Sequence, residues 1–327
     1  MINDSLKIIE TSHINGQVFD ITELVVDPQW TTNRDSQAGK FTFNIVDNPT
    51  VFLRQGDIIE AYWDDKKFFK GKVYANSRKK SFNGWAITAY DLMFLFKSED
   101  TIVFPANNAA SRFEQICKIL NIPYKIGMVP GYNCTARVAD KESFFSMIDD
   151  AIQETKERVN ARYMIYDDVG TIRFVGYQEL NTRFIFGDNS MMTDYDYVGS
   201  MEEAYNSVKV IKEDDKNKSR EVYQAKDSGS INKFGLLQKA VAPNDAKMNG
   251  QQMQEQANNL LKQLNKAVNT FSFEGVGLMP LRAGNNFHLQ LEALGGYIGG
   301  DIVCSIKSCT HTFLPVHTVS CEVELIL

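Results

Sequence analysis

The chain lacks a long apolar run, an excess of positive charge and an even number of cysteines. No apolar stretch approaches the roughly 20 residues that a membrane-spanning helix needs. The opening residues MINDSLKIIE contain no apolar segment, so no secretory signal is expected. A net charge of −6 argues against a dedicated nucleic-acid binder, which usually carries a basic face. Five irregularly spaced cysteines are typical of reduced, buried thiols in a protein made in the cytosol.

Catalytic motifs are also missing. The chain has no nucleophile elbow, zinc-protease helix or phosphate loop, and Gly275-Val-Gly277 reads as a turn before a strand. Paired acids that hydrolyse glycosides must face each other across about 5–10 Å from separate elements. The four acidic doublets are instead neighbours at turns or on one helix: Asp149-Asp150, Asp167-Asp168, Glu202-Glu203 and Asp214-Asp215. We therefore expect no catalytic residue, no enzyme activity and no cofactor.

A cluster of metal-binding residue types lies near the C-terminus. Its spacings fall partly within the range of zinc sites. Cys304 and Cys309 lie an odd number of residues apart on one expected strand, which predicts side chains on opposite faces. A half-buried closing strand is therefore the favoured interpretation, and a metal site is the weaker one. Four residues remain as weak metal candidates: Cys309, His311, His317 and Cys321.

The strongest positive signal is a pattern that occurs twice. Phe41-Thr-Phe43 is followed by Arg54-Gln-Gly56, and Phe271-Ser-Phe273 is followed by Arg282-Ala-Gly284. Alternating apolar runs, typical of strands, follow each glycine: 57–63, 68–77 and 85–91 in the first copy, and 286–292, 301–313 and 317–327 in the second. The sequence therefore predicts one β-module in two copies.

The other segments predict a small α+β region and a few loops. The expected elements are a hairpin over 6–26 around Asn15-Gly16, a helix capped at Asn107-Asn108, a helix capped by Asp140, hairpins over 163–176 and 206–226, a loop over 229–243 and a helix over 248–268. Residues 28–39 are polar and end in glycine, which predicts a long loop exposing Trp30.

These elements predict a mainly β protein, with two similar β-barrel modules flanking a small α+β insert. The expected domains are residues 1–98, 99–186 and 187–327, and helix 248–268 belongs to the last of these. The loop 28–39 and the segment 274–281 occupy matching positions in the two copies. Apolar groups in such loops indicate contact surfaces, and the interface candidates are Trp30, Arg34, Leu278 and Met279.

An ordered set of motifs resembles the baseplate hub proteins of contractile phage tails, in particular the XkdQ-like group of prophages and phage-tail-like bacteriocins. The motifs are GKFTFNIVDNP (39–49), YQAKDSGSINKFGLLQ (223–238), Arg282-Ala-Gly284, and His311-Thr-Phe313 followed by His317. The resemblance covers essentially the whole chain. It implies a hub similar to those of T-even and pyocin-type tails.

The resemblance implies a structural hub. Three subunits would form a homotrimeric ring of six similar modules, a symmetry adapter between the six-fold tail tube and the three-fold central spike. Its partners would be the tail tube protein, the spike protein and other baseplate proteins, without specific nucleic-acid binding. The protein would be assembled in the cytoplasm of a bacterial host and then form part of a virion or tail-like particle.

Two alternatives remain open. One is a tail component that binds cell-wall carbohydrate or hydrolyses peptidoglycan through the acidic doublets. The other is a β-domain stabilised by zinc through the C-terminal cysteines and histidines. The sequence does not identify the host, the spike or the loops that contact each partner.

Overall fold

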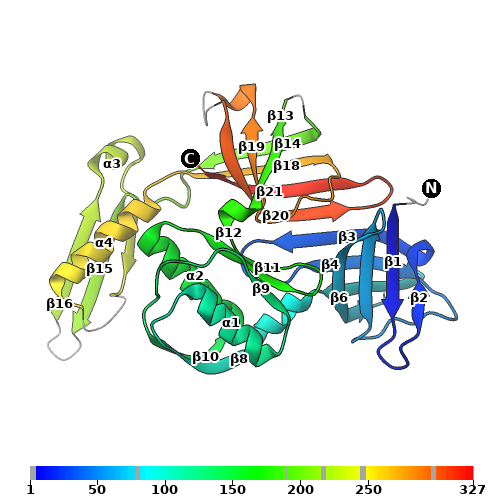
Figure 1. Ribbon diagram of the computed structural model, residues 1–327. Helices are drawn as coiled ribbons and strands as arrows, with labels where there is room; N and C mark the ends of the chain where they lie inside the picture. Colours follow the sequence, from blue (N-terminus) through cyan, green and yellow to red (C-terminus); the bar gives the residue numbers. More distant parts are fainter. Residues whose placement is uncertain are drawn as a thin grey trace. The chain divides into compact units, whose positions relative to one another are not determined.

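The computed structural model describes residues 5–78, 82–188, 190–214, 219–243, 248–295 and 300–326 (Figure 1). The chain divides into two compact units: unit 1 contains Met1–Asp196 and Phe271–Leu327, and unit 2 contains Tyr197–Thr270. The protein is mainly β, as expected, and its described strands include one large, mostly antiparallel sheet. None of the helices in the described segments is long and apolar enough to span a membrane.

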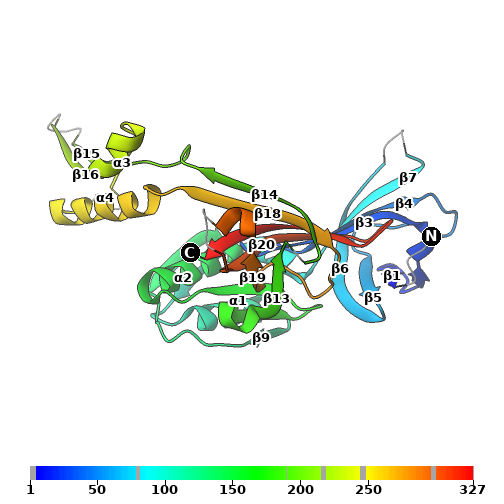
Figure 2. The same cartoon turned by 90° about the horizontal axis from the view of Figure 1, so that it is seen from above.

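The first β-module is built from the N-terminal strands of unit 1. These are β1 (Leu6–Thr11), β2 (Val18–Asp20), β3 (Val25–Asn33), β4 (Lys40–Val46), β5 (Ile58–Trp63), β6 (Lys66–Ser77) and β7 (Gly84–Tyr90). Alternate residues of β4 are buried, namely Phe41, Phe43 and Ile45, because side chains alternate between the faces of a strand. The strand order is β3-β4-β7-β6-β5-β1-β2. Figure 2 shows these strands curving around the side on which β1 lies.

The second β-module repeats this order with strands from both parts of unit 1. Its strands are β13 (Asn181–Gly187), β14 (Met192–Ser200), β18 (Val268–Val276), β19 (Asn286–Gln290), β20 (Ile302–Thr312) and β21 (Thr318–Ile326). The order β14-β18-β21-β20-β19-β13 matches β3-β4-β7-β6-β5-β1 position by position. One pairing differs, because β1 is antiparallel to β5 whereas β13 is parallel to β19. Pairing of β20 with β3 joins the two modules into one sheet.

This sheet does not close on itself within the described residues. Its order runs from β14 at one end to β2 at the other. The predicted mainly β composition is confirmed, whereas closure of each module into a barrel stays a prediction.

The turn that contains Gly56 in the first module and Gly284 in the second has the same hydrogen bonds in both copies. The N–H of Gly56 donates to the carbonyl of Val73, and the N–H of Gly284 donates to the carbonyl of Ile306, both at 2.8 Å. The two glycines have φ of +97° and +91°, a region that suits glycine because it has no Cβ. In each copy the next residue caps the turn, since Asp57 accepts from the N–H of Arg54 at 2.6 Å and Asn285 from that of Arg282 at 2.8 Å.

A β-bulge is duplicated as well. In β6 the register against β7 shifts between Val73 and Ala75, and in β20 the register against β21 shifts between Ile306 and Ser308. Asn76 of β6 therefore corresponds to Cys309 of β20. Their side chains both approach equivalent carbonyls: Asn76 Nδ2 lies 3.1 Å from the oxygen of Leu53, and Cys309 Sγ lies 3.9 Å from that of Leu281. Two residues further along each strand, Arg78 corresponds to His311.

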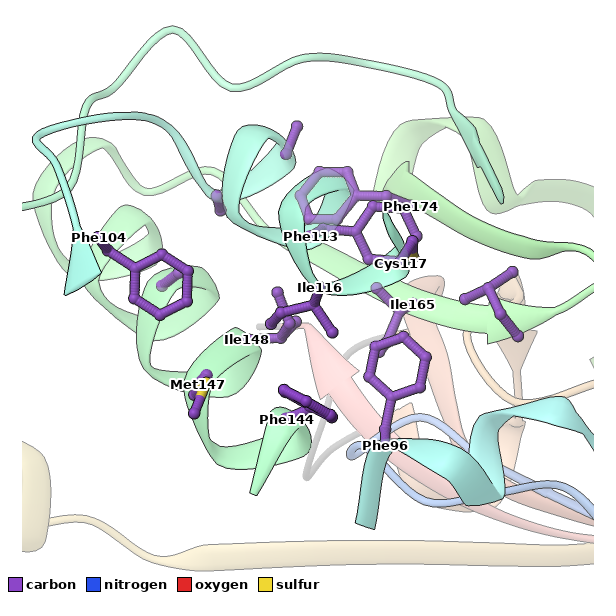
Figure 3. Close-up of a cluster of buried hydrophobic side chains, with 14 of the residues drawn as sticks. Phe96, Phe104, Phe113, Ile116, Cys117, Phe144, Met147, Ile148, Ile165 and Phe174 are labelled. Atoms are coloured by element: carbon purple, nitrogen blue, oxygen red, sulfur yellow. The ribbon is translucent and has the colours of Figure 1, made fainter. Parts of the chain in front are cut away.

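The α+β insert lies between the modules in the chain and belongs to unit 1. It contains β8 (Glu99–Phe104), α1 (Ala109–Leu120), β9 (Tyr124–Ile126), β10 (Arg137–Ser143), α2 (Phe144–Val159), β11 (Tyr163–Asp167) and β12 (Ile172–Gly176). Its core is formed by buried side chains of both helices and the strands beside them, including Phe113, Ile116, Phe144, Ile148 and Phe174 (Figure 3).

The insert confirms one predicted cap and corrects another. Asn108 caps α1 by accepting from the N–H of Ser111 at 2.9 Å, as expected. The prediction that Asp140 caps the second helix is wrong: α2 begins at Phe144, and its cap is Ser143. Asp140 instead lies in β10, which pairs with β8. Sequence analysis missed both of these strands.

Unit 2 is a small sheet covered by one helix. It contains β15 (Ser207–Asp214), β16 (Ser219–Lys226), α3 (Ser228–Phe234), β17 (Gln238–Val241) and α4 (Gly250–Leu264). The strand order is β16-β15-β17, and Met253 and Ala257 of α4 pack on Val210 and Ala225. The hairpin of β15 and β16 is confirmed, while its charged tip at 215–218 lies outside the described residues.

Two expectations for this region are wrong. Residues 229–243 do not form one loop, because they contain most of α3 and all of β17. The helix expected over 248–268 spans Gly250–Leu264, and Val268 begins β18 instead.

The expected long loop over residues 28–39 is also wrong in its first half. Val25–Asn33 form β3, which has β4 on one edge and β20 on the other. Trp30 is consequently buried, with only 6% of its surface exposed. A polar strand reads as a loop in the sequence because its stabilising partner, β20, lies almost at the far end of the chain.

Candidate functional site

The two β-modules contact each other through unlike edges, with β3 contributed by the first module and β20 by the second. Residues Gln29–Asn33 pair with Ser308–Thr312 in antiparallel register. Side chains support the pairing: the hydroxyl oxygens of Thr31 and Thr310 are 3.0 Å apart. The N–H of Ala283 donates to the hydroxyl of Thr32 at 2.9 Å. The contact is therefore a continuous strand pairing reinforced by buried polar groups.

Aromatic rings from both modules fill the space beside this pairing. Trp30 stacks on His311 with ring centroids 5.3 Å apart, and Phe313 stacks on Phe68 at 5.0 Å. Phe313 comes directly after β20, yet it is fully buried in the core of the first module. His317 lies against Trp63 at 4.5 Å. The second module thus supplies part of the first module's core.

The four interface candidates lie on or beside this internal contact. Trp30 is in the strand pairing, and Met279 packs against the core of the first module. Leu278 is half-buried next to it. The guanidinium of Arg34 is nearly buried and donates to Glu324 at 2.6 Å. A role for any of them toward another protein stays a prediction.

The weak metal candidates come together at the same place. The thiols of Cys309 and Cys321 lie 3.4 Å apart on directly paired residues, and both cysteines are free and buried. The expectation that Cys304 and Cys309 face opposite sides is wrong. The bulge at Lys307 adds one residue to β20, so both thiols lie on the buried face.

Hydrogen bonds occupy both ring nitrogens of His311. Its Nε2 lies 2.8 Å from the carbonyl oxygen of Leu281, and its Nδ1 lies 2.9 Å from Nε2 of His317. A carbonyl can only accept, so Nε2 of His311 carries the proton and Nδ1 accepts from His317. Among the described residues no group of three or more His, Cys, Asp or Glu side chains is arranged to hold a metal ion. In this arrangement the two imidazoles act as hydrogen-bonding core residues.

Acid is expected to weaken this histidine pair. Burial lowers the pKa of His311 to about 4, and burial does the same for the pKa of His317. Because these values lie below the ordinary value of 6.5, the unfolded chain binds protons first as the pH falls from 6.5 to 4. Folding stability is lost in that window. His311→Gln retains an N–H for Leu281 and removes the titration, so wild type should lose roughly 2 kcal/mol relative to the variant by pH 5.

Urea unfolding of both proteins between pH 7.5 and pH 5 measures this difference. His288 is exposed and serves as the matched control, so His288→Gln should follow wild type across the range. Parallel curves for wild type and His311→Gln would show that the buried ring is not the titrating group.

A charge cluster of buried Asp167 with half-buried Asp91 and Arg282 lies where the first module, the insert and the second module meet. Asp91 follows β7, Asp167 ends β11, and Arg282 lies in the duplicated turn. The Asp91 carboxylate accepts from the N–H groups of Gly39 and Met93 at 2.8 and 3.0 Å. The Asp167 carboxylate accepts from those of Leu92 and Gly170 at 3.1 and 2.6 Å.

Arg282 is the cation of this cluster. Its guanidinium donates to the backbone oxygen of Asp167 at 3.2 Å and lies over the ring of Tyr166 at 3.9 Å. Burial raises the pKa of Asp167 to about 6. Burial, followed by the nearby charge of Asp167, raises the pKa of Asp91, and Arg282 opposes both increases. The cluster therefore links three parts of unit 1 by charge.

The acidic doublets do not form a dyad. Asp149 accepts from Ser36, whereas its neighbour Asp150 pairs with Arg137. Asp168 pairs with Arg173 at 3.1 Å, whereas Asp167 belongs to the cluster of Asp91 and Arg282. Glu202-Glu203 lie in a turn, and Asp215 lies outside the described residues.

Sequence analysis missed the role of Arg282 and of Asp91. One signal was available in the repeat itself. The two copies of the turn read Arg-Gln-Gly-Asp and Arg-Ala-Gly-Asn, so the copy with the half-buried arginine lacks the neighbouring acid and instead has Asp91 and Asp167 nearby.

Known proteins resemble the chain in both sequence and fold. The YqbQ-like family model matches residues 28–324. The chain is 27% identical over 248 residues to YqbQ, an uncharacterised protein of Bacillus subtilis, and 24% identical over 246 residues to XkdQ, a protein of the phage-like element PBSX of the same organism. Each match covers 74% of both chains.

Solved structures show the same fold at low identity. A 43 kDa tail protein of prophage MuSo2 from Shewanella oneidensis superposes with a TM-score of 0.68 at 10% identity, over 97% of this chain and 98% of that one. VgrG–PdpA complexes of Francisella contain a chain with a TM-score of 0.56 at 10% identity, over 98% of this chain and 58% of that one. Because the family model covers most of the chain, the chain belongs to the YqbQ-like family; it is similar in sequence to XkdQ and shares its fold with the prophage tail protein.

Proposed function

We propose that the protein is the hub of a contractile-tail baseplate, in which three copies form a ring of six tube-type β-barrel modules. The observation that carries the proposal is the repeated strand order together with the pairing of β3 with β20. Unlike edges meet in this contact, so it is heterologous. A heterologous contact that repeats with a suitable rotation closes into a ring.

The duplication explains why such a ring suits a junction between a six-fold tube and a three-fold spike. Because each chain contains two similar modules, a trimer presents six similar surfaces to the tube. The chain as a whole occurs three times in the ring, which matches the spike. The tail tube protein would bind one face of the ring and the central spike protein the other. The insert and unit 2 differ from the β-modules and would meet other baseplate proteins.

The proposed role is mechanical. The solved structures that share the fold include tail proteins and a chain of a VgrG complex, which favours a structural part over an enzyme. In the described residues the acidic doublets are separated into different ion pairs and hydrogen bonds, so they do not favour hydrolysis of cell-wall polymers.

Native mass spectrometry of the purified chain, alone and with a candidate trimeric spike protein, tests the proposal. We expect a trimer that binds one trimeric spike. A chain that stays monomeric in both samples over a wide concentration range would contradict it. Co-expression with an unrelated trimeric protein is the control for non-specific association.

A further inference from the structure

Among the described residues, β20 pairs with three strands, whereas its counterpart β6 pairs with two. Along one edge of β20, β19 pairs with Ile302–Ser305 and β3 pairs with Ser308–Thr312, while β21 occupies the other edge. On β6, β5 pairs with Lys66–Lys72 and β7 takes the other edge. No strand of the described segments pairs with the remaining part of β6, Ala75–Ser77, on the edge that β5 shares.

The backbone groups that face this open edge follow from the duplicate. In β20 the carbonyl of Lys307 accepts from Arg34, and the N–H of Phe313 donates to the carbonyl of Pro28. Hydrogen bonds alternate along an antiparallel pair, so Cys309 and His311 also direct their backbone groups toward β3. Their counterparts in β6 are Asn76 and Arg78. An edge with unpaired backbone groups is a template for another strand.

A hollow of about 530 Å³ lies beside this edge. Its lining includes Phe52, Leu53, Asn76 and Arg78. Phe52 is 61% exposed, an unusual position for a phenylalanine. At the corresponding place in the second module, β3 lies on β20 and Trp30 stacks on His311, the counterpart of Arg78. The hollow in the first module thus corresponds to the place in the second module that β3 and Trp30 fill.

The strand that corresponds to β3 is β14. It lies beside β18 as β3 lies beside β4, and it is the last strand of the described sheet order. Its other edge, which in β3 carries the pairing with β20, has no partner strand among the described residues. The internal contact joins an edge of β3 to an edge of β20. The equivalent edges, on β14 and on β6, have no partner strand among the described residues.

We propose that the edge of β14 in one copy of this chain pairs antiparallel with Ala75–Arg78 of β6 in a second copy, and that its side chains fill the hollow beside Phe52. The occupant is a second copy because the internal β3–β20 contact shows that these two kinds of edge fit each other. This inference rests on the proposed trimer and specifies the surface that closes it.

Two substitutions at Arg78 test the pairing. Arg78→Pro removes the outward N–H and places a ring where the incoming strand would lie, whereas Arg78→Ala retains the N–H. Both variants lose the ion pair with Asp47 and the contact with Trp85, so they differ only in the backbone N–H and the proline ring. Half-assembly of Arg78→Pro should need at least about a tenfold higher protein concentration than that of Arg78→Ala.

Hydrogen exchange on the wild-type protein gives a readout that does not depend on folding of a variant. The amides of Asn76 and Arg78 should be protected in the trimer as strongly as those of Cys309 and His311, which are already paired within the chain. They should exchange much faster in the monomer obtained by dilution.

The outcomes separate the two proposals. A wild-type trimer with protected Asn76 and Arg78 amides, which is weakened by Arg78→Pro but not by Arg78→Ala, supports the pairing. A wild-type trimer in which these two amides exchange rapidly, or in which both variants assemble equally, overturns the pairing and leaves the trimer intact. A wild-type chain that never trimerises overturns both.

Discussion

Phe313→Ala is expected to lower the free energy of unfolding of unit 1 by about 3–5 kcal/mol, the usual cost of removing a fully buried phenylalanine. The side chain projects from the end of β20 into the core of the first module, where it contacts Phe68 and Trp63 at 5.0 and 5.6 Å. Its removal leaves a cavity between the two β-modules that a strand-paired contact cannot easily collapse.

Chemical unfolding followed by tryptophan fluorescence measures this loss, because Trp30 and Trp63 report directly on the contact. Phe234→Ala is the matched control, since Phe234 is 43% exposed in unit 2 and its loss should cost little. A cost below about 1 kcal/mol for Phe313→Ala would show that the modules do not share a core.

Arg282→Met should cost about 2–4 kcal/mol near pH 7.5, because it leaves Asp91 and Asp167 close together without their cation. Methionine retains much of the apolar contact with Tyr166. The turn itself should persist, since its glycine and its Asn285 cap are unchanged. Urea unfolding measures the cost. Arg54→Met changes the equivalent residue of the first module, which is exposed, and should cost less than about 0.5 kcal/mol.

The cost of Arg282→Met should depend on pH. Burial raises the pKa of both carboxyls above the ordinary value of 3.8, to about 6 for Asp167. A group with a raised folded-state pKa contributes most stability below its unfolded pKa and loses that contribution as the pH rises through the folded value. Without Arg282 the folded values rise further, so the variant should be penalised more at pH 7.5 than at pH 5. A cost that stays equal or grows on acidification would exclude this explanation.

The sequence predicted those parts of the fold that depend on local patterns. Strands β4 to β7 and β18 to β21 carry their own alternation of buried and exposed residues, and Asn108 caps α1 through its own side chain. The repeat was also visible, because Gly56 and Gly284 are required by a backbone with positive φ.

Elements that depend on distant partners were not predictable in this way. β3 has a polar sequence, and it is a strand because β20 covers one of its edges. The bulge at Lys307 reverses the faces of the residues after it, so counting residues placed Cys309 on the wrong side. Arg282 is recognisable as the cation of a charge cluster only when Asp91 and Asp167 are brought to it by two other parts of the chain.

The most direct measurement of the central claim is an electron-microscopy reconstruction of the assembled ring, calculated without imposed symmetry. The account predicts six similar β-modules around one axis, alternating between first and second modules, with β14 of each chain beside β6 of the next. A ring in which the two modules of one chain lie at different radii, or one with another number of modules, would contradict it.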